Sequence, residues 1–173
     1  LHRVDRRQRQ MCISDRIMVE VALVSSHAPW TPVASLVPWS EIGDGAIFNA
    51  QAQSGPTPEE VWRDLSSIRD HYRQTIEYML TSMVSFVTEF GDDDVVVLLL
   101  GDHPPAPMIS GDPDTDQVIA HIIASDPKVI EAVSRWEWQK GMLPNGDAPV
   151  WRMDDLRDRF IKDFSQETTK AIE

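Results

Sequence analysis

The chain has 173 residues, of which 42% are hydrophobic and 25% charged, a composition typical of one globular domain with a sizeable core. Its formal net charge of −12 at pH 7 argues against nucleic acid as a partner, because non-specific phosphate binding needs a basic surface. The single cysteine, Cys12, excludes an internal disulfide. The longest apolar run is far shorter than the roughly 20 residues of a membrane-spanning helix.

Residues 1–16 differ from the rest of the chain. They hold five arginines and two aspartates and show neither an apolar period nor turn residues. We interpret them as an atypical basic arm: a solvated terminus, the end of a truncated helix, or the artefact of a broken reading frame. No function is inferred from this arm, and Cys12 is not a candidate nucleophile. Residues 166–173 are expected to form a polar tail.

The predicted elements alternate between strand and helix along the chain. Valine-rich residues 17–26 predict a strand, and a proline-rich loop follows in which Trp30 and Trp39 can act as anchors. Thr57 is the expected N-cap of a short helix that starts with a proline. Apolar residues at steps of three and four predict a long helix over residues 66–90.

The second half of the chain continues this alternation. Apolar runs predict two more strands, and two helices are expected after them; the ranges are 95–100 and 117–125 for the strands, and 126–136 and 153–164 for the helices. Residues 95–100 are apolar on both faces, as in an interior strand of a parallel or mixed sheet. The order of elements predicts an α/β fold, with a mixed sheet flanked by helices.

Histidines occur at or within each of the three predicted strands. His27 ends the first, Asp102 and His103 follow the second, and His121 lies inside the third. Ligands of open α/β sheets bind at the carboxyl ends of the strands, so these positions indicate a binding site. His27 is alternatively a loop histidine tied to the backbone, and His121 a satisfied histidine facing the core. Trp30 either packs the loop or offers a platform to a substrate.

Asp102 and His103 are the candidate metal ligands. A carboxylate oxygen and an imidazole nitrogen together suit Zn²⁺ or Mn²⁺ better than Mg²⁺ or Ca²⁺. Gly101 lets the backbone turn sharply, so that both side chains can face one cavity. The alternative is an aspartate that accepts a backbone N–H beside an ordinary loop histidine.

Five stretches of the sequence resemble a known family. The segment VVVLLLGDH, preceded by the helix YRQTIEYMLTSMVSFVTEF, resembles the C-terminal half of the sulfatase-like branch of the alkaline phosphatase superfamily. SSHAPW is similar to that family's Ser/Thr–His–x–Pro–aromatic segment. Together with VPW and IGDG, these motifs most resemble actinobacterial membrane-anchored sulfatases and lipoteichoic acid synthase-like phosphoglycerol transferases. The resemblance spans residues 17–164, so we expect residues 17–165 to be the C-terminal portion of a catalytic domain.

The resemblance implies an alkaline-phosphatase-like fold and a metal-dependent hydrolase or transferase that acts on sulfate or phosphate esters. It implies that Asp102 and His103 bind a divalent metal, Mn or Zn being favoured over Ca or Mg. His27 would face the anionic ester substrate, for which a lipid- or glycan-linked ester is one option, and His121 and Trp30 are further substrate-binding candidates.

The resemblance also indicates what lies elsewhere. The family's hydroxyl nucleophile is found upstream of the matching region, so no catalytic nucleophile is expected within this chain, and the chain alone is expected to be inactive. In the parent protein, upstream N-terminal helices would supply the membrane association and place the domain on the extracytoplasmic face of the cell membrane.

Two other function classes are considered. A non-enzymatic α/β interaction domain would use the acidic surface as its binding face. A Ser-His-Asp hydrolase is disfavoured, because the sequence has no G-x-S-x-G elbow and Ser26 adjoins His27 in the chain.

Overall fold

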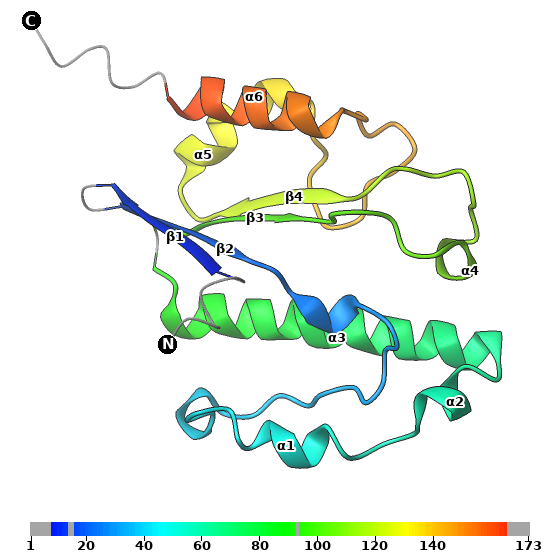
Figure 1. The fold of residues 1–173 in the computed structure, drawn as a ribbon. Helices are drawn as coiled ribbons and strands as arrows, with labels where there is room; N and C mark the ends of the chain where they lie inside the picture. The colour runs from blue at the N-terminus through cyan, green and yellow to red at the C-terminus, as the bar shows by residue number, and fades with distance from the viewer. Residues whose placement is uncertain (1–7, 14–15, 93, 166–173) are drawn as a thin grey trace, which may run out of the picture. The chain divides into compact units, whose positions relative to one another are not determined.

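The computed structural model describes residues 8–13, 16–92 and 94–165. The described chain combines helices with two small antiparallel sheets, which agrees with the predicted mixture of helix and strand (Figure 1). It divides into two compact units, Leu1–Phe86 and Val87–Glu173. The segment predicted as part of a catalytic domain, residues 17–165, spans both units.

The predicted parallel or mixed sheet is wrong for the described residues. Each described sheet has two strands, and both pairs are antiparallel. The prediction assumed that residues 95–100 are buried on both faces because they are apolar throughout. In the structure, one face of this strand stays 37–43% exposed, at Val96, Leu98 and Leu100.

The first unit starts with a hairpin of β1 (Gln8–Ile13) and β2 (Arg16–Val21), with Met11 opposite Met18. Part of the basic arm is therefore a strand, and the alternative of a truncated helix end is wrong for residues 8–13. Pairing with a valine-rich neighbour satisfies backbone N–H and C=O groups, which the arm's composition does not reveal. The predicted strand is also too long, because Val24–Ser26 form the 3-10 helix η1.

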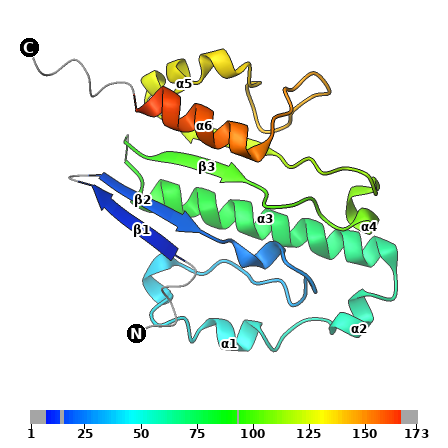
Figure 2. The ribbon, with the colours of Figure 1, turned by 45° about the horizontal axis from the view of Figure 1, so that its top comes forward.

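The long helix α3 (Leu65–Phe90) organises the rest of the first unit and agrees with the prediction. The Asp64 carboxylate accepts the Ser67 N–H at 2.9 Å, as an N-cap does. Short helices α1 (Phe48–Gln51) and α2 (Pro58–Val61) lie along one side of α3 (Figures 1 and 2), and η2 (Trp39–Glu41) precedes them. The buried residues of this unit are Trp30, Thr31, Val61, Ile68 and Thr75.

The second unit contains the hairpin of β3 (Val96–Leu100) and β4 (Ala120–Ala124), in which Leu99 pairs with His121. Both strands were predicted, with longer boundaries. The connection between them includes the short helix α4 (Pro107–Ser110).

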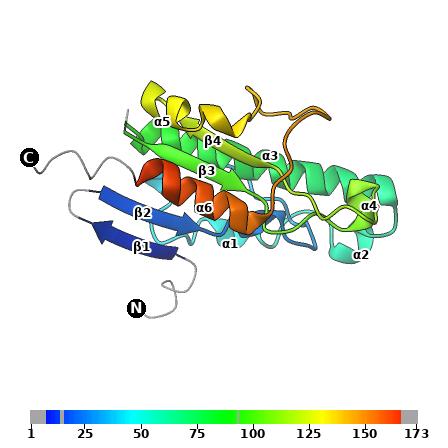
Figure 3. The ribbon, with the colours of Figure 1, turned by 90° about the horizontal axis from the view of Figure 1, so that it is seen from above.

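Helices cover one face of the β3–β4 hairpin (Figures 2 and 3). They are α5 (Pro127–Ala132), η3 (Ser134–Trp136) and α6 (Met153–Phe164), and the last matches its predicted range. Val133, Trp136 and Leu156 form the buried core against Ala120 and Ile122 of β4. Among the described residues, no helix is long and apolar enough to cross a membrane.

Candidate functional site

His27 lies in a loop of the first unit. The sequence pattern predicted His27 at the end of a strand. In the structure it follows η1, so this prediction is wrong. Its Nδ1 atom is 2.8 Å from the Ala28 carbonyl oxygen. A carbonyl oxygen only accepts hydrogen bonds, so Nδ1 carries a proton and Nε2 stays available for a ligand. The backbone bond and a ligand-binding role use different ring nitrogens, so the two interpretations of His27 are compatible.

Trp30, three residues further on, is a packed side chain. Its indole is 6% exposed, stacks on Trp62 with ring centroids 5.4 Å apart, and meets the edge of Tyr72 at 5.4 Å. The Trp30 Nε1–H group donates to the Ser26 carbonyl oxygen at 2.8 Å. These contacts show how Trp30 packs the loop, one of its two predicted roles.

The backbone of Trp30 is strained. Its φ angle is 60°, in the left-handed region, where an L residue with a side chain is disfavoured by about 1–2 kcal/mol. Such a conformation persists only where the surrounding structure determines it, and here the buried indole does so.

A cleft lies between this loop and α3, within the first unit. It encloses about 200 Å³, and its walls include His27, Trp30, Thr31, Thr75 and Tyr78. A second hollow of about 370 Å³ shares Tyr78 with it and is lined mainly by apolar residues, among them Phe48. A protonated His27 could donate its Nε2–H to an anion in the first cleft.

Trp39, the other predicted loop anchor, also contacts α3. Its Nε1–H group donates to Ser85 Oγ at 2.9 Å, and its ring meets Phe86 edge-on at 5.8 Å. Both tryptophans of the proline-rich loop thus contact this helix, as anchors of the loop.

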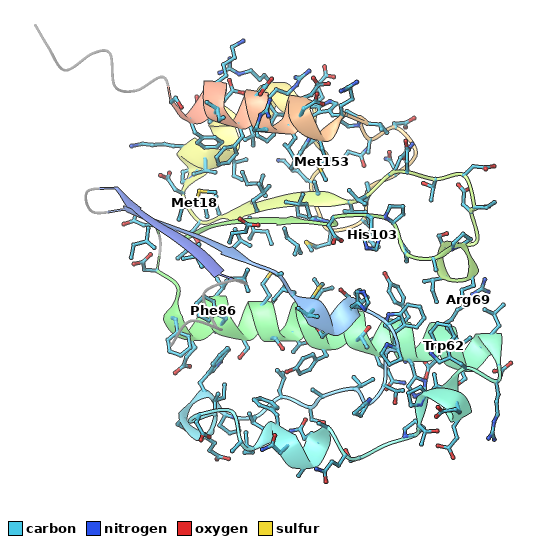
Figure 4. All side chains as sticks on the ribbon, in the orientation of Figure 1. Met18, Trp62, Arg69, Phe86, His103 and Met153 are labelled. Atoms are coloured by element: carbon cyan, nitrogen blue, oxygen red, sulfur yellow. The ribbon has the colours of Figure 1, made fainter. Side chains whose placement is uncertain are left out.

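Asp102 and His103 follow β3 in the second unit, and Figure 4 shows His103 just beyond the end of that strand. The Asp102 carboxylate accepts the His103 backbone N–H at 3.0 Å. His103 Nδ1 lies 2.9 Å from the Pro104 carbonyl oxygen, so this nitrogen carries a proton and leaves Nε2 available. The side chains are 92% and 72% exposed, respectively.

Gly101 is needed for a reason other than the predicted sharp turn. Its φ angle is not in the left-handed region, and its N–H donates to the Ile119 carbonyl oxygen at 3.2 Å, which extends the β3–β4 ladder by one residue. A Cβ atom here would lie 3.1 Å from Cβ of Val118, closer than ordinary van der Waals contact. The glycine permits a close approach of the two chain segments.

The two free donor atoms of the Asp102–His103 pair can be compared with what a metal requires. Asp102 Oδ2 and His103 Nε2 are 3.9 Å apart. Two ligands at about 2.0–2.2 Å from one ion can be separated by at most about 4.4 Å, and tetrahedral geometry places them about 3.4 Å apart, so the pair is within reach of a single ion after a shift of about 0.5 Å. The described residues contain no cluster of three or more His, Cys, Asp or Glu side chains arranged to bind a metal. The pair therefore offers two ligands, and a complete shell needs others.

His121 makes its hydrogen bond elsewhere in the second unit. It lies opposite Leu99, three residues before Asp102 in the sequence. Its Nε2 atom is 2.9 Å from the Met142 carbonyl oxygen, so this ring nitrogen is the protonated one. This bond ties the loop before α6 to β4 and satisfies the histidine.

The predicted site residues thus form two groups. His27 and Trp30 belong to the first unit, and Asp102, His103 and His121 to the second. Reasoning from the sequence missed Trp62, whose ring stacks on Trp30, and Tyr78, which lines both hollows. Tyr78 belongs to the helical segment used for the resemblance, whereas nothing in the sequence around Trp62 marks it.

Comparisons with known proteins add no family. No protein-family model matches the chain, and no curated protein or solved structure is significantly similar to it.

Proposed function

We propose that this chain carries part of the divalent metal site of a sulfatase-like hydrolase or transferase with an alkaline-phosphatase-like fold. The Asp102–His103 pair is the observation that carries the proposal. Its free oxygen and nitrogen are 3.9 Å apart, and a backbone carbonyl fixes the histidine tautomer. Metal-binding histidines characteristically donate their other ring N–H to such an acceptor.

In this proposal Asp102 and His103 hold the ion, and Mn²⁺ or Zn²⁺ suits their oxygen and nitrogen donors. When bound, such an ion lowers the pKa of a coordinated hydroxyl group and stabilises charge on the transferred group. Separately, within the first unit, His27 is proposed as an anion-binding residue. Its Nδ1–H bond to Ala28 holds the ring and leaves Nε2–H to donate to a sulfate or phosphate oxygen.

The nucleophile of the proposed reaction comes from outside this sequence. We therefore propose that the chain alone does not turn over sulfate or phosphate esters. In the parent protein the domain would lie on the extracytoplasmic face of the cell membrane, as the resemblance implies.

The test is a calorimetric titration of Mn²⁺ and Zn²⁺ into the full chain. We expect Asp102→Ala and His103→Ala each to lower the affinity at least about tenfold, because each removes one of two protein ligands. The matched controls are Asp112→Ala, an exposed loop aspartate, and His71→Ala, a helix histidine, and both should bind like wild type. Absent binding, or equal losses in site and control variants, would contradict the metal site.

One observation favours a second candidate, a non-enzymatic interaction domain. Four apolar residues of β2, Ile17, Met18, Val19 and Val21, are 50–64% exposed. An exposed apolar strand is a common docking surface for a partner. If neither ion binds with dependence on Asp102 and His103, this second function gains support.

A further inference from the structure

We propose that Trp62 and Tyr72 are positioning residues that hold His27 in place through Trp30. The inference rests on the proposed anion-binding role of His27 and adds the residues that fix its orientation. Neither Trp62 nor Tyr72 needs to touch the ligand for this role.

The first step is the dependence of the His27 ring on its own loop. Within the part of the chain that the structure describes, this ring is hydrogen-bonded through Nδ1 to the carbonyl oxygen of Ala28, the next residue. The ring orientation therefore follows the peptide unit between Ala28 and Pro29. Any residue that fixes this peptide also directs Nε2 of His27.

The second step is that residues on both sides of Trp30 are bonded to one segment of the chain. The Trp62 Nε1–H group donates to the Pro29 carbonyl oxygen at 3.1 Å. The Thr31 hydroxyl donates to the Pro56 carbonyl oxygen at 2.7 Å. Residues 56–62 thus hold the loop both before and after its strained residue.

The third step concerns the rings. Trp30 and Trp62 are nearly parallel, with an interplanar angle of 7°, and Tyr72 packs against Trp30 at 77°. Such aromatic pairs contribute beyond the area that they bury. They offset the cost of the left-handed backbone at Trp30 and so retain the loop in one conformation.

The position of Trp62 is itself fixed locally. It is the C-cap residue of α2, whose first turn is closed by reciprocal bonds between Thr57 and Glu60. Figure 4 shows Trp62 where α2 meets the start of α3. The indole that holds the His27 loop is therefore attached to a capped helix turn.

The experiment measures the His27 ring and its ligand in the full chain. At mildly alkaline pH the ¹⁵N NMR signals of the neutral imidazole report its tautomer. At mildly acid pH a titration with inorganic phosphate reports anion binding by the protonated ring. We expect Trp62→Leu and Tyr72→Leu to mix the two tautomers and to weaken phosphate binding about tenfold, since small displacements of a positioned group have large effects. Trp62→Phe keeps a stacking ring but loses the bond to Pro29, so it should fall between wild type and Trp62→Leu.

The matched control is Trp39→Phe, which makes the same chemical change as Trp62→Phe. Trp39 lies in the proline-rich loop that also holds His27, and its ring packs against Phe86. Trp39→Phe should leave tautomer and affinity unchanged. Because Trp62 is 41% exposed, its substitution is expected to leave α3 folded, which amide NMR signals check. If Trp62→Leu does unfold the unit, Trp62→Phe decides by the same two measurements.

The outcomes separate this inference from the proposed function. If His27→Ala abolishes phosphate binding while the Trp62 and Tyr72 variants bind like wild type with one tautomer, the positioning role is overturned and the anion role of His27 stands. If His27→Ala leaves phosphate binding unchanged, both are overturned.

Discussion

His27 and His103 share one local hydrogen-bond arrangement, but the residues around the two rings differ. In each, Nδ1 is bonded to the carbonyl oxygen of the following residue, at 2.8 Å from Ala28 and 2.9 Å from Pro104. Both histidines therefore offer Nε2 to a ligand. The difference lies in the neighbours: His27 borders a cleft beside a buried tryptophan, whereas His103 has a carboxylate 3.9 Å away and is 72% exposed.

This difference assigns different chemistry to the same ring. In the proposed function, Nε2 of His103 and an oxygen of Asp102 together bind a cation. The described residues that line the His27 cleft include no carboxylate, so an anion there meets no like charge from them. The two histidines are also held in place differently. The paired strands β3 and β4 precede Asp102, whereas aromatic side chains pack against the His27 loop.

The largest effect that tests this contrast is expected at Trp30. Replacing it by alanine removes a buried indole and should lower the free energy of unfolding of the first unit by about 3–5 kcal/mol. Trp30→Gly loses the same ring but tolerates a φ of 60°, so it should be about 1 kcal/mol more stable than Trp30→Ala. Urea unfolding measures both.

The order of those two variants is diagnostic, because glycine is usually the less stable substitution. A Trp30→Gly protein that is less stable than Trp30→Ala would show that the loop relaxes out of the left-handed conformation. Metal affinity at Asp102 and His103 provides the control, since neither substitution touches that pair.

The sequence predicted individual elements better than their partners. Residues 153–164 form α6 as expected, because a single amphipathic period with acidic residues at its start specifies a helix. The direction of pairing between β3 and β4 was missed, since an apolar run does not record the orientation of its neighbour. The strand at residues 8–13 was missed because its stabilising contacts come from backbone pairing with β2.

The same reasoning applies to the candidate site. Asp102 and His103 were predictable as a pair, because adjacency in the sequence brings their side chains within reach of one ion. The support of His27 was not predictable, because Trp62 lies 35 residues away in the sequence and belongs to no periodic pattern. The left-handed backbone of Trp30 was equally hidden, because bulky residues rarely adopt it.

A smaller effect is expected from Tyr72 at alkaline pH. Burial raises the pKa of the Tyr72 phenol above its ordinary value of 10.0. The folded first unit thus favours the neutral phenol, and this contribution to stability is complete below pH 10 and is lost as the pH rises through the raised pKa. We expect the urea midpoint of the first unit to fall above about pH 10.

Tyr72→Phe should lose part of that alkaline decline, because phenylalanine keeps the ring against Trp30 and has no proton to lose. Tyr78→Phe makes the same chemical change at the other tyrosine of the sequence and is the matched comparison. Parallel pH profiles for wild type and Tyr72→Phe between about pH 9 and 11 would contradict the buried position of the phenol.

The smallest effect is expected at His121, and it separates stability from metal binding in the second unit. His121→Ala removes the bond to the Met142 carbonyl and should lower the free energy of unfolding by about 1 kcal/mol, with no change in Mn²⁺ affinity. His103→Ala should do the reverse, because an exposed ring contributes little to stability while its Nε2 is a proposed ligand. Urea unfolding and calorimetry on both variants give this crossed pattern. Equal losses of Mn²⁺ affinity in the two variants would make His121 a third ligand, and the structural role assigned to its bond with Met142 would then be wrong.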